Sequence, residues 1–292
     1  MKKKLLLTMG CSCTEGVGAY DMNFIEDMKR KHPEYNNITD HHMVYEDSKD
    51  RFHKYSWPSA LQKKIKYDKL INMGRRSSSN SQQLKMFVEK FADTNFSEEY
   101  DVLVVWLLTH PSRISFYNNG QIETILNNFF ADVEAYDNLS KALMTWIEDP
   151  HNDFLLEQLY EIRLMKLICK AYGYKFLFSS LSTYTNDFVT KVCPSLNENN
   201  IDYFYKNMIG YNGRPLKSFS NIQPPERDTN PEYYSTICFH PNERGYDYIA
   251  QNMFTVINKF FPSYVNDTEP VEYESIYDGH IMNWKEMIQT QV

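Results

Sequence analysis

The chain has 292 residues and carries 31 Lys and Arg residues against 38 Asp and Glu residues, a formal net charge of −7. This acidic balance argues against a protein built mainly to grip nucleic acid, and no apolar run approaches the roughly 20 residues of a membrane helix. The five cysteines are odd in number and scattered, which predicts free thiols in a reducing compartment. We therefore expect a globular protein with no nucleic-acid and no membrane partner.

The sequence begins with Met1, which three lysines and then Leu5-Leu6-Leu7 follow. The apolar stretch ends at Met9-Gly10, which is short for the 7–15 residues of a signal-peptide core. We therefore predict a buried strand over residues 4–9 and no signal peptide. The abundance of Asn, Lys, Ile and Tyr is typical of AT-rich coding DNA. It favours a phage, viral or low-GC bacterial source, with the protein in the cytoplasm or, if phage-encoded, in the virion.

Further apolar runs predict central strands over residues 102–108 and 175–178, and a weaker one over 69–72. None alternates strictly with polar residues, as expected of parallel strands covered on both faces. Two stripes with helical spacing predict core-facing helices. They comprise Leu156, Leu159, Tyr160, Leu164, Leu167, Ile168 and Ala171, and Tyr246, Ile249, Ala250, Met253, Phe254, Ile257 and Phe261. This alternation predicts a three-layer α/β/α sandwich with a mostly parallel central sheet, whose functional loops lie at the carboxyl ends of the strands.

The chain shows no linker between two domains. We predict one domain over residues 1–262 with an inserted helical segment over about 118–150. A polar, proline-rich loop is expected over 213–232, and residues 263–292 form a C-terminal tail without clear periodicity.

The turn after the first strand reads Gly10-Cys11-Ser12-Cys13-Thr14-Glu15-Gly16-Val17-Gly18. A serine just past a strand end, among small residues, is placed where a sheet presents reactive groups, and the backbone N–H groups that follow could stabilise an oxyanion. The glycine spacing fits neither a dinucleotide-binding loop nor a phosphate loop. No cysteine or histidine spacing fits a zinc site, so we expect neither cofactor nor metal.

A second candidate lies near the other end of the chain, in His240-Pro241-Asn242-Glu243-Arg244-Gly245-Tyr246. The Pro and Asn predict a turn, and an apolar stripe starts at Tyr246. His240 is therefore expected in a loop just before a helix, where an imidazole can face a cleft.

Together these segments resemble the SGNH (GDSL-type) hydrolases, whose first block reads Gly-Asp-Ser-hydrophobic-Ser/Thr-x-Gly-x-Gly and whose last block reads Asp-x-x-His-Pro-Asn-x-x-Gly-His. The form of the first block is similar to the Gly-Cys-Ser-Phe-Thr-Glu-Gly variant of phage-encoded members. The resemblance spans roughly residues 4–260. It implies Ser12 as the nucleophile, His240 as its general base, and the N–H groups of Ser12 and Ser77 as oxyanion donors. Cys11 is then a packing residue.

The chain departs from this pattern at three places. Ser77 stands where the second block, here Asn72 to Asn80, has its glycine. The third block lacks its Gly-x-Asn-Asp, so Thr109 or His110 would replace the asparagine donor. Ile237 stands where the family has the aspartate that orients the histidine. Asp228, Glu226 or a backbone carbonyl could take over that role.

Two functions follow from the resemblance. The first is a serine esterase that acts on a small-molecule or glycan ester and is expected to remove acyl or acetyl groups from a carbohydrate. The alternative is an SGNH-fold binding or virion structural protein with weak or no catalysis, which the departures favour. A homo-oligomer or a virion assembly is compatible with either. Arg75, Arg76 and Arg113 lie near the predicted carboxyl edge, where they could bind an anionic substrate or be solvated surface residues.

Overall fold

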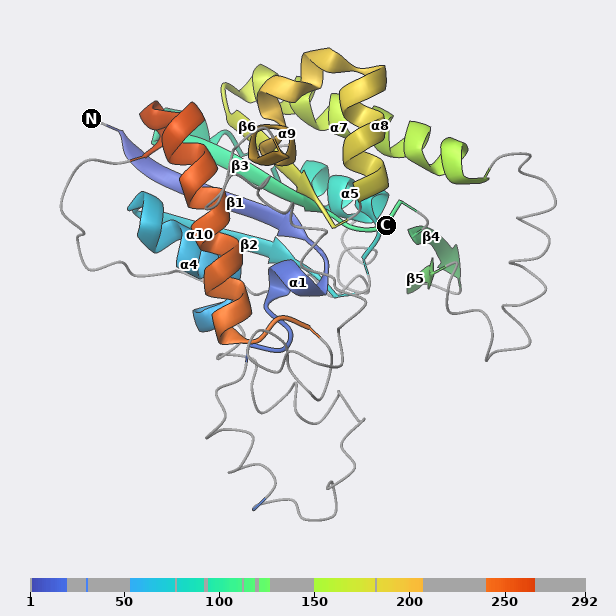
Figure 1. Cartoon of the computed structure of the whole chain (residues 1–292), viewed down its shortest axis with the longest axis horizontal. Helices are drawn as coiled ribbons and strands as arrows, with labels where there is room; N and C mark the ends of the chain where they lie inside the picture. The colour runs from blue at the N-terminus through green and yellow to red at the C-terminus, as the bar shows by residue number, and fades with distance from the viewer. Residues whose placement is uncertain are drawn as a thin grey trace.

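The computed structural model describes residues 2–19, 30, 53–76, 78–91, 94–111, 113–118, 121–126, 150–181, 183–206 and 240–265. Its centre is a four-stranded parallel sheet in the order β2-β1-β3-β6 (Figure 1). The strands are β1 (Lys3–Gly10), β2 (Lys69–Gly74), β3 (Tyr100–Leu108) and β6 (Lys175–Ser180). All four predicted strands are confirmed, as is their parallel direction.

Helices cover both faces of the sheet, which confirms the three-layer α/β/α architecture. One face packs on α5 (Asn80–Phe91), α7 (Pro150–Tyr172) and α8 (Thr183–Val192). The other packs on α4 (Trp57–Ile65), α9 (Ile201–Lys206) and α10 (Glu243–Phe260) (Figure 1). Alternate side chains of β1 enter the two cores: Leu5 and Leu7 belong to the first and Leu6 to the second. Burial on both faces explains why the strands are continuously apolar.

The prediction of a helical insertion over about residues 118–150 is wrong for its first part. An antiparallel pair follows β3, formed by β4 (Arg113–Asn118) and β5 (Gln121–Leu126). Polar and apolar residues alternate at the start of both segments, and Asn119-Gly120 lies between them in the sequence. That dipeptide is a strong hairpin signal, and it outweighs the helical spacing further along. Residues 127–149, the rest of the predicted insertion, lie outside the described residues.

Helix α7 is confirmed, but the face assigned to the core is wrong in part. Leu156, Tyr160, Leu164 and Leu167 are 38%, 61%, 48% and 63% exposed. The helix instead turns a second apolar side toward the sheet, formed by Leu155, Leu159, Ile162, Met165 and Cys169. Because α7 is apolar on both sides, the spacing of its apolar residues could not identify which side is buried. Helix α10 follows the prediction, with Tyr246, Ile249, Ala250, Met253 and Ile257 buried.

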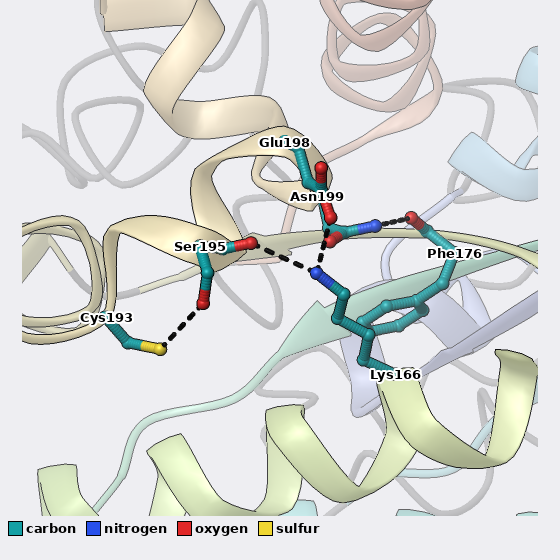
Figure 2. Close-up of polar contacts among 6 residues, drawn as sticks. All are labelled: Lys166, Phe176, Cys193, Ser195, Glu198 and Asn199. Atoms are coloured by element: carbon teal, nitrogen blue, oxygen red, sulfur yellow. Dashed lines mark hydrogen bonds and ion pairs between the residues drawn. The ribbon is translucent and has the colours of Figure 1, made fainter.

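The far end of α7 is tied to the segment after α8. Figure 2 shows Lys166 reaching the 3-10 helix η4 (Pro194–Asn199), where its Nζ lies 3.0 Å from the Ser195 carbonyl and 2.5 Å from the Glu198 carboxylate. Asn199 donates to the Phe176 carbonyl of β6 at 2.8 Å. These contacts hold η4 between α7 and β6. None of the residues in them belongs to the segments that carry Ser12 or His240.

The start of the predicted tail packs on the domain. Residues Pro262–Tyr264 form the 3-10 helix η7, and the Tyr264 ring stacks on Phe261 at 5.3 Å. Phe261 in turn meets Phe204 of α9 edge to face. Residues 266–292 lie outside the described residues, as does the predicted loop over 213–232.

Candidate active site

Ser12 stands directly past the carboxyl end of β1. The strand ends at Gly10, and Ser12–Glu15 form the single turn α1, which Gly16 closes in the left-handed region at φ 100°. The turn is tight because the Thr14 side chain and the Leu107 backbone both lie close to Gly10. A Cβ at Gly10 would lie 1.9 Å from Thr14 Oγ1 and 2.9 Å from the Leu107 carbonyl oxygen. Ser12 is thereby held at the strand end with only 7% of its surface exposed.

His240 comes from the other end of the chain and reaches this serine. Its Nε2 lies 2.8 Å from Ser12 Oγ, across 228 residues of sequence. The position of His240 follows from α10, which begins just after it. Asn242 caps that helix by accepting the Gly245 N–H at 3.0 Å. An imidazole at this distance from a hydroxyl is placed to take its proton.

A second hydrogen bond fastens the two segments together. The buried Tyr246 hydroxyl, in the first turn of α10, donates to the Val17 carbonyl at 2.6 Å. Val17 lies just past α1, so the bond joins the segment of the serine to the helix of the histidine. Sequence reasoning placed Tyr246 in the apolar stripe only, and its hydroxyl was the signal that could have pointed to a polar partner.

The end of β2 supports the same turn. Asn72 is buried, and its Nδ2 donates to the Thr14 carbonyl at 2.9 Å while its Oδ1 accepts the Gly74 N–H at 2.9 Å. The next N–H, of Arg75, donates to the Gly10 carbonyl at 3.0 Å. Gly74 is required here because a Cβ would lie 2.2 Å from the Glu15 backbone nitrogen. Ser77, the predicted second oxyanion donor, lies outside the described residues.

Thr109 and His110 follow the end of β3 and differ sharply in exposure. Thr109 is 1% exposed, whereas His110 is exposed. The Thr109 backbone is fixed by α5 and α7: its N–H donates to Asn80 Oδ1 at 2.9 Å, and its carbonyl accepts Gln158 Nε2 at 3.0 Å. Thr109 Oγ1 is buried without a hydrogen bond of normal geometry. Of the two candidates, Thr109 is therefore the one with a buried hydroxyl, and this hydroxyl lies near the Cys11 thiol.

The cysteines on either side of Ser12 are free thiols. Cys11 is 1% exposed and lies 3.9 Å from Ser12 Oγ through its sulfur. A hydrogen bond from Cys13 holds the pKa of the Cys11 thiol well below its usual value, against the effect of burial. The positive charge of Arg113 and the nearby Thr109 hydroxyl act in the same direction as Cys13. The burial of Cys11 fits its predicted role in packing.

Several residues named from the sequence cannot be placed. Ile237 and its proposed replacements Asp228 and Glu226 lie outside the described residues. Within the described part of the chain, no three His, Cys, Asp or Glu side chains are grouped as metal ligands. Among the same residues, no helix is both long and apolar enough to cross a bilayer.

The fold and site define an α/β sandwich with a serine–histidine pair at the carboxyl edge of its parallel sheet. The chain matches no established family profile, and no curated protein matches it. Its structure is similar to the crystal structure of a lipase, Lip_vut3, from a goat rumen metagenome. The TM-score is 0.40 and the identity 14%, covering 87% of this chain and 97% of the lipase chain. A likeness of this extent says nothing about what this chain acts on.

Proposed function

We propose that the chain is a serine ester hydrolase of the SGNH type that acts on acyl or acetyl esters, with a carbohydrate ester as the expected substrate class. The observation that carries the proposal is the 2.8 Å contact between His240 Nε2 and Ser12 Oγ at the carboxyl edge of the sheet. Functional groups of open α/β sheets gather at this edge. The resemblance of the two sequence segments to the SGNH blocks supports the same reaction.

In the proposed reaction, Ser12 Oγ attacks the ester carbonyl while His240 takes its proton. The proton passes to the leaving alcohol, and an acyl-serine remains. Water, deprotonated by His240, then attacks the acyl-serine and releases the acid. The N–H of Ser12 is one oxyanion donor, because the first N–H groups of a helix have no partner within it. The Ser77 N–H is the second, and the buried Thr109 hydroxyl replaces the missing asparagine.

The test is labelling with a fluorophosphonate, which reacts with activated serines. Wild-type protein should label, whereas Ser12→Ala and His240→Ala should not. Ser97→Ala, a half-buried serine in the 3-10 helix Phe96–Glu98, is the matched control and should label normally. If a folded wild type does not label, the esterase proposal is wrong, and the alternative of a binding or virion structural protein takes its place.

The oxyanion assignment has its own test. Loss of one oxyanion donor lowers the rate by about 10²–10³, so Thr109→Ala should slow ester hydrolysis by about this factor. His110→Ala, at the neighbouring exposed position, should change the rate by less than about threefold. The reverse order of effects would assign the donor to His110.

A further inference from the structure

Three arginines follow the carboxyl ends of the strands near Ser12, and two of them are engaged by Glu15. This glutamate is 3% exposed, and its Oε2 accepts the Arg76 N–H at 2.7 Å. Burial lowers the pKa of Arg75, and the Glu15 carboxylate opposes that shift by favouring the charged guanidinium. The Glu15 carboxylate thus contacts the loop after β2.

Arg113, the first residue of β4, differs from Arg75 and Arg76 in its hydrogen bonds and ion pairs. Its Nη1 makes one long contact, 3.5 Å to the Ser78 carbonyl, and its Nε is buried without a hydrogen-bond partner. Among the described residues, no carboxylate forms an ion pair with it. The side chain is half-buried, so this cation is partly removed from water without an opposite charge. Removing a charged group from water costs free energy unless an opposite charge or hydrogen bonds compensate it.

The place of Arg113 relative to the serine is fixed by the sheet. Strands β1 and β3 are paired up to Gly10 and Leu107, one residue short of the end of β3. A turn then brings the Arg113 N–H to the His110 carbonyl at 3.1 Å. The Arg113 Nη1 lies 3.5 Å from the Ser78 carbonyl, and the Ser78 hydroxyl lies 3.4 Å from the carbonyl of Gly10, two residues before Ser12. These contacts place the guanidinium on the Ser12 side of this edge.

We propose that Arg113 forms a carboxylate-binding subsite beside Ser12, so that the ester hydrolysed here carries a carboxylate on its acyl or its alcohol part. This inference rests on the proposed function. A guanidinium pairs with a carboxylate through directional, charge-assisted hydrogen bonds, and one unpaired arginine matches the single charge of a carboxylate. An ester of an acidic sugar or a half-ester of a dicarboxylic acid has this chemistry.

The first experiment compares matched esters. Mono-4-nitrophenyl glutarate and 4-nitrophenyl pentanoate differ by a carboxylate on the acyl side. 4-Acetoxybenzoate and its methyl ester differ by one on the alcohol side. Wild type should prefer the charged member of one pair in kcat/KM, and Arg113→Gln should lower that preference at least about tenfold. Arg113→Lys, which keeps the charge, should restore part of it. Arg163→Gln, an exposed arginine of α7, is the control.

A binding measurement separates the two proposals. Monomethyl glutarate is titrated calorimetrically into Ser12→Ala, which cannot turn it over, and into the same variant carrying Arg113→Gln. Weaker binding by the double variant supports the subsite even if fluorophosphonate labelling fails and the esterase proposal falls. Equal binding, or a preference for charged esters that survives in Arg113→Gln, overturns the subsite while normal labelling leaves the esterase proposal standing. Circular dichroism of each variant verifies folding.

Discussion

Replacing Asn72 by alanine probes how β2 supports the turn that carries Ser12. The side chain satisfies three polar groups at once: it accepts from Thr8 Oγ1 at 3.2 Å and from the Gly74 N–H, and it donates to the Thr14 carbonyl. Asn72 is 5% exposed, so water replaces these bonds poorly. Each buried group left without a partner costs about 1–3 kcal/mol. Allowing for partial relaxation, we expect a loss of about 3 kcal/mol in the free energy of unfolding.

The assay is urea unfolding followed by circular dichroism, with the fluorophosphonate labelling rate as a second readout. Labelling should slow because Asn72 holds the backbone of α1 through Thr14. Asn95→Ala is the matched control: this exposed asparagine caps a 3-10 helix by accepting the Ser97 N–H at 3.1 Å. Its loss should cost about 1 kcal/mol or less and leave labelling unchanged. Equal stability of the two variants would refute the view that Asn72 supports the turn.

Three other changes test separate parts of the structure. Burial raises the pKa of Glu161 to about 8, whereas an unfolded chain ionises near 4.3. Wild type should therefore lose stability as pH rises through 8, and Glu161→Gln should gain a few kcal/mol relative to wild type between pH 5 and 9 in urea titrations. Leu164→Lys should change the melting temperature little, whereas Met165→Lys should lower it severely, and similar effects would contradict the orientation of α7. Tyr246→Phe removes the bond to Val17 and should cost about 1 kcal/mol in urea unfolding, and an unchanged stability would count against that bond.

The layers of the fold were predictable because strands buried on both faces are continuously apolar, and such runs are visible in the sequence. Residues 102–108 carry no charge and lie in a strand covered on each side. The orientation of α7 was not predictable, since Leu164 and Met165 are equally apolar and only the neighbouring helices decide which one meets the core. The β4–β5 pair was predictable in principle. Its Asn119-Gly120 dipeptide is typical of a hairpin turn.

Some residues of the candidate site were predictable from the sequence and others were not. Ser12 and His240 stand in recognisable local segments, and the structure brings their side chains together. The state of Arg113 could not be predicted, because whether an arginine is paired depends on which side chains the fold brings beside it. Likewise, the buried hydroxyl of Thr109 and the exposure of His110 are set by Asn80 and Gln158 on other elements, which no local pattern reveals.

The 228 residues between Ser12 and His240 also set an order of events during synthesis. The serine leaves the ribosome well before its histidine, which follows only after strands β2, β3 and β6 have been made. At 5–20 residues per second the interval is roughly 10–45 s. Throughout that time Ser12 lacks the imidazole of His240. Docking of α10 is thus the step at which the pair first exists, and any chaperone that delays this helix also delays the appearance of the assembled site.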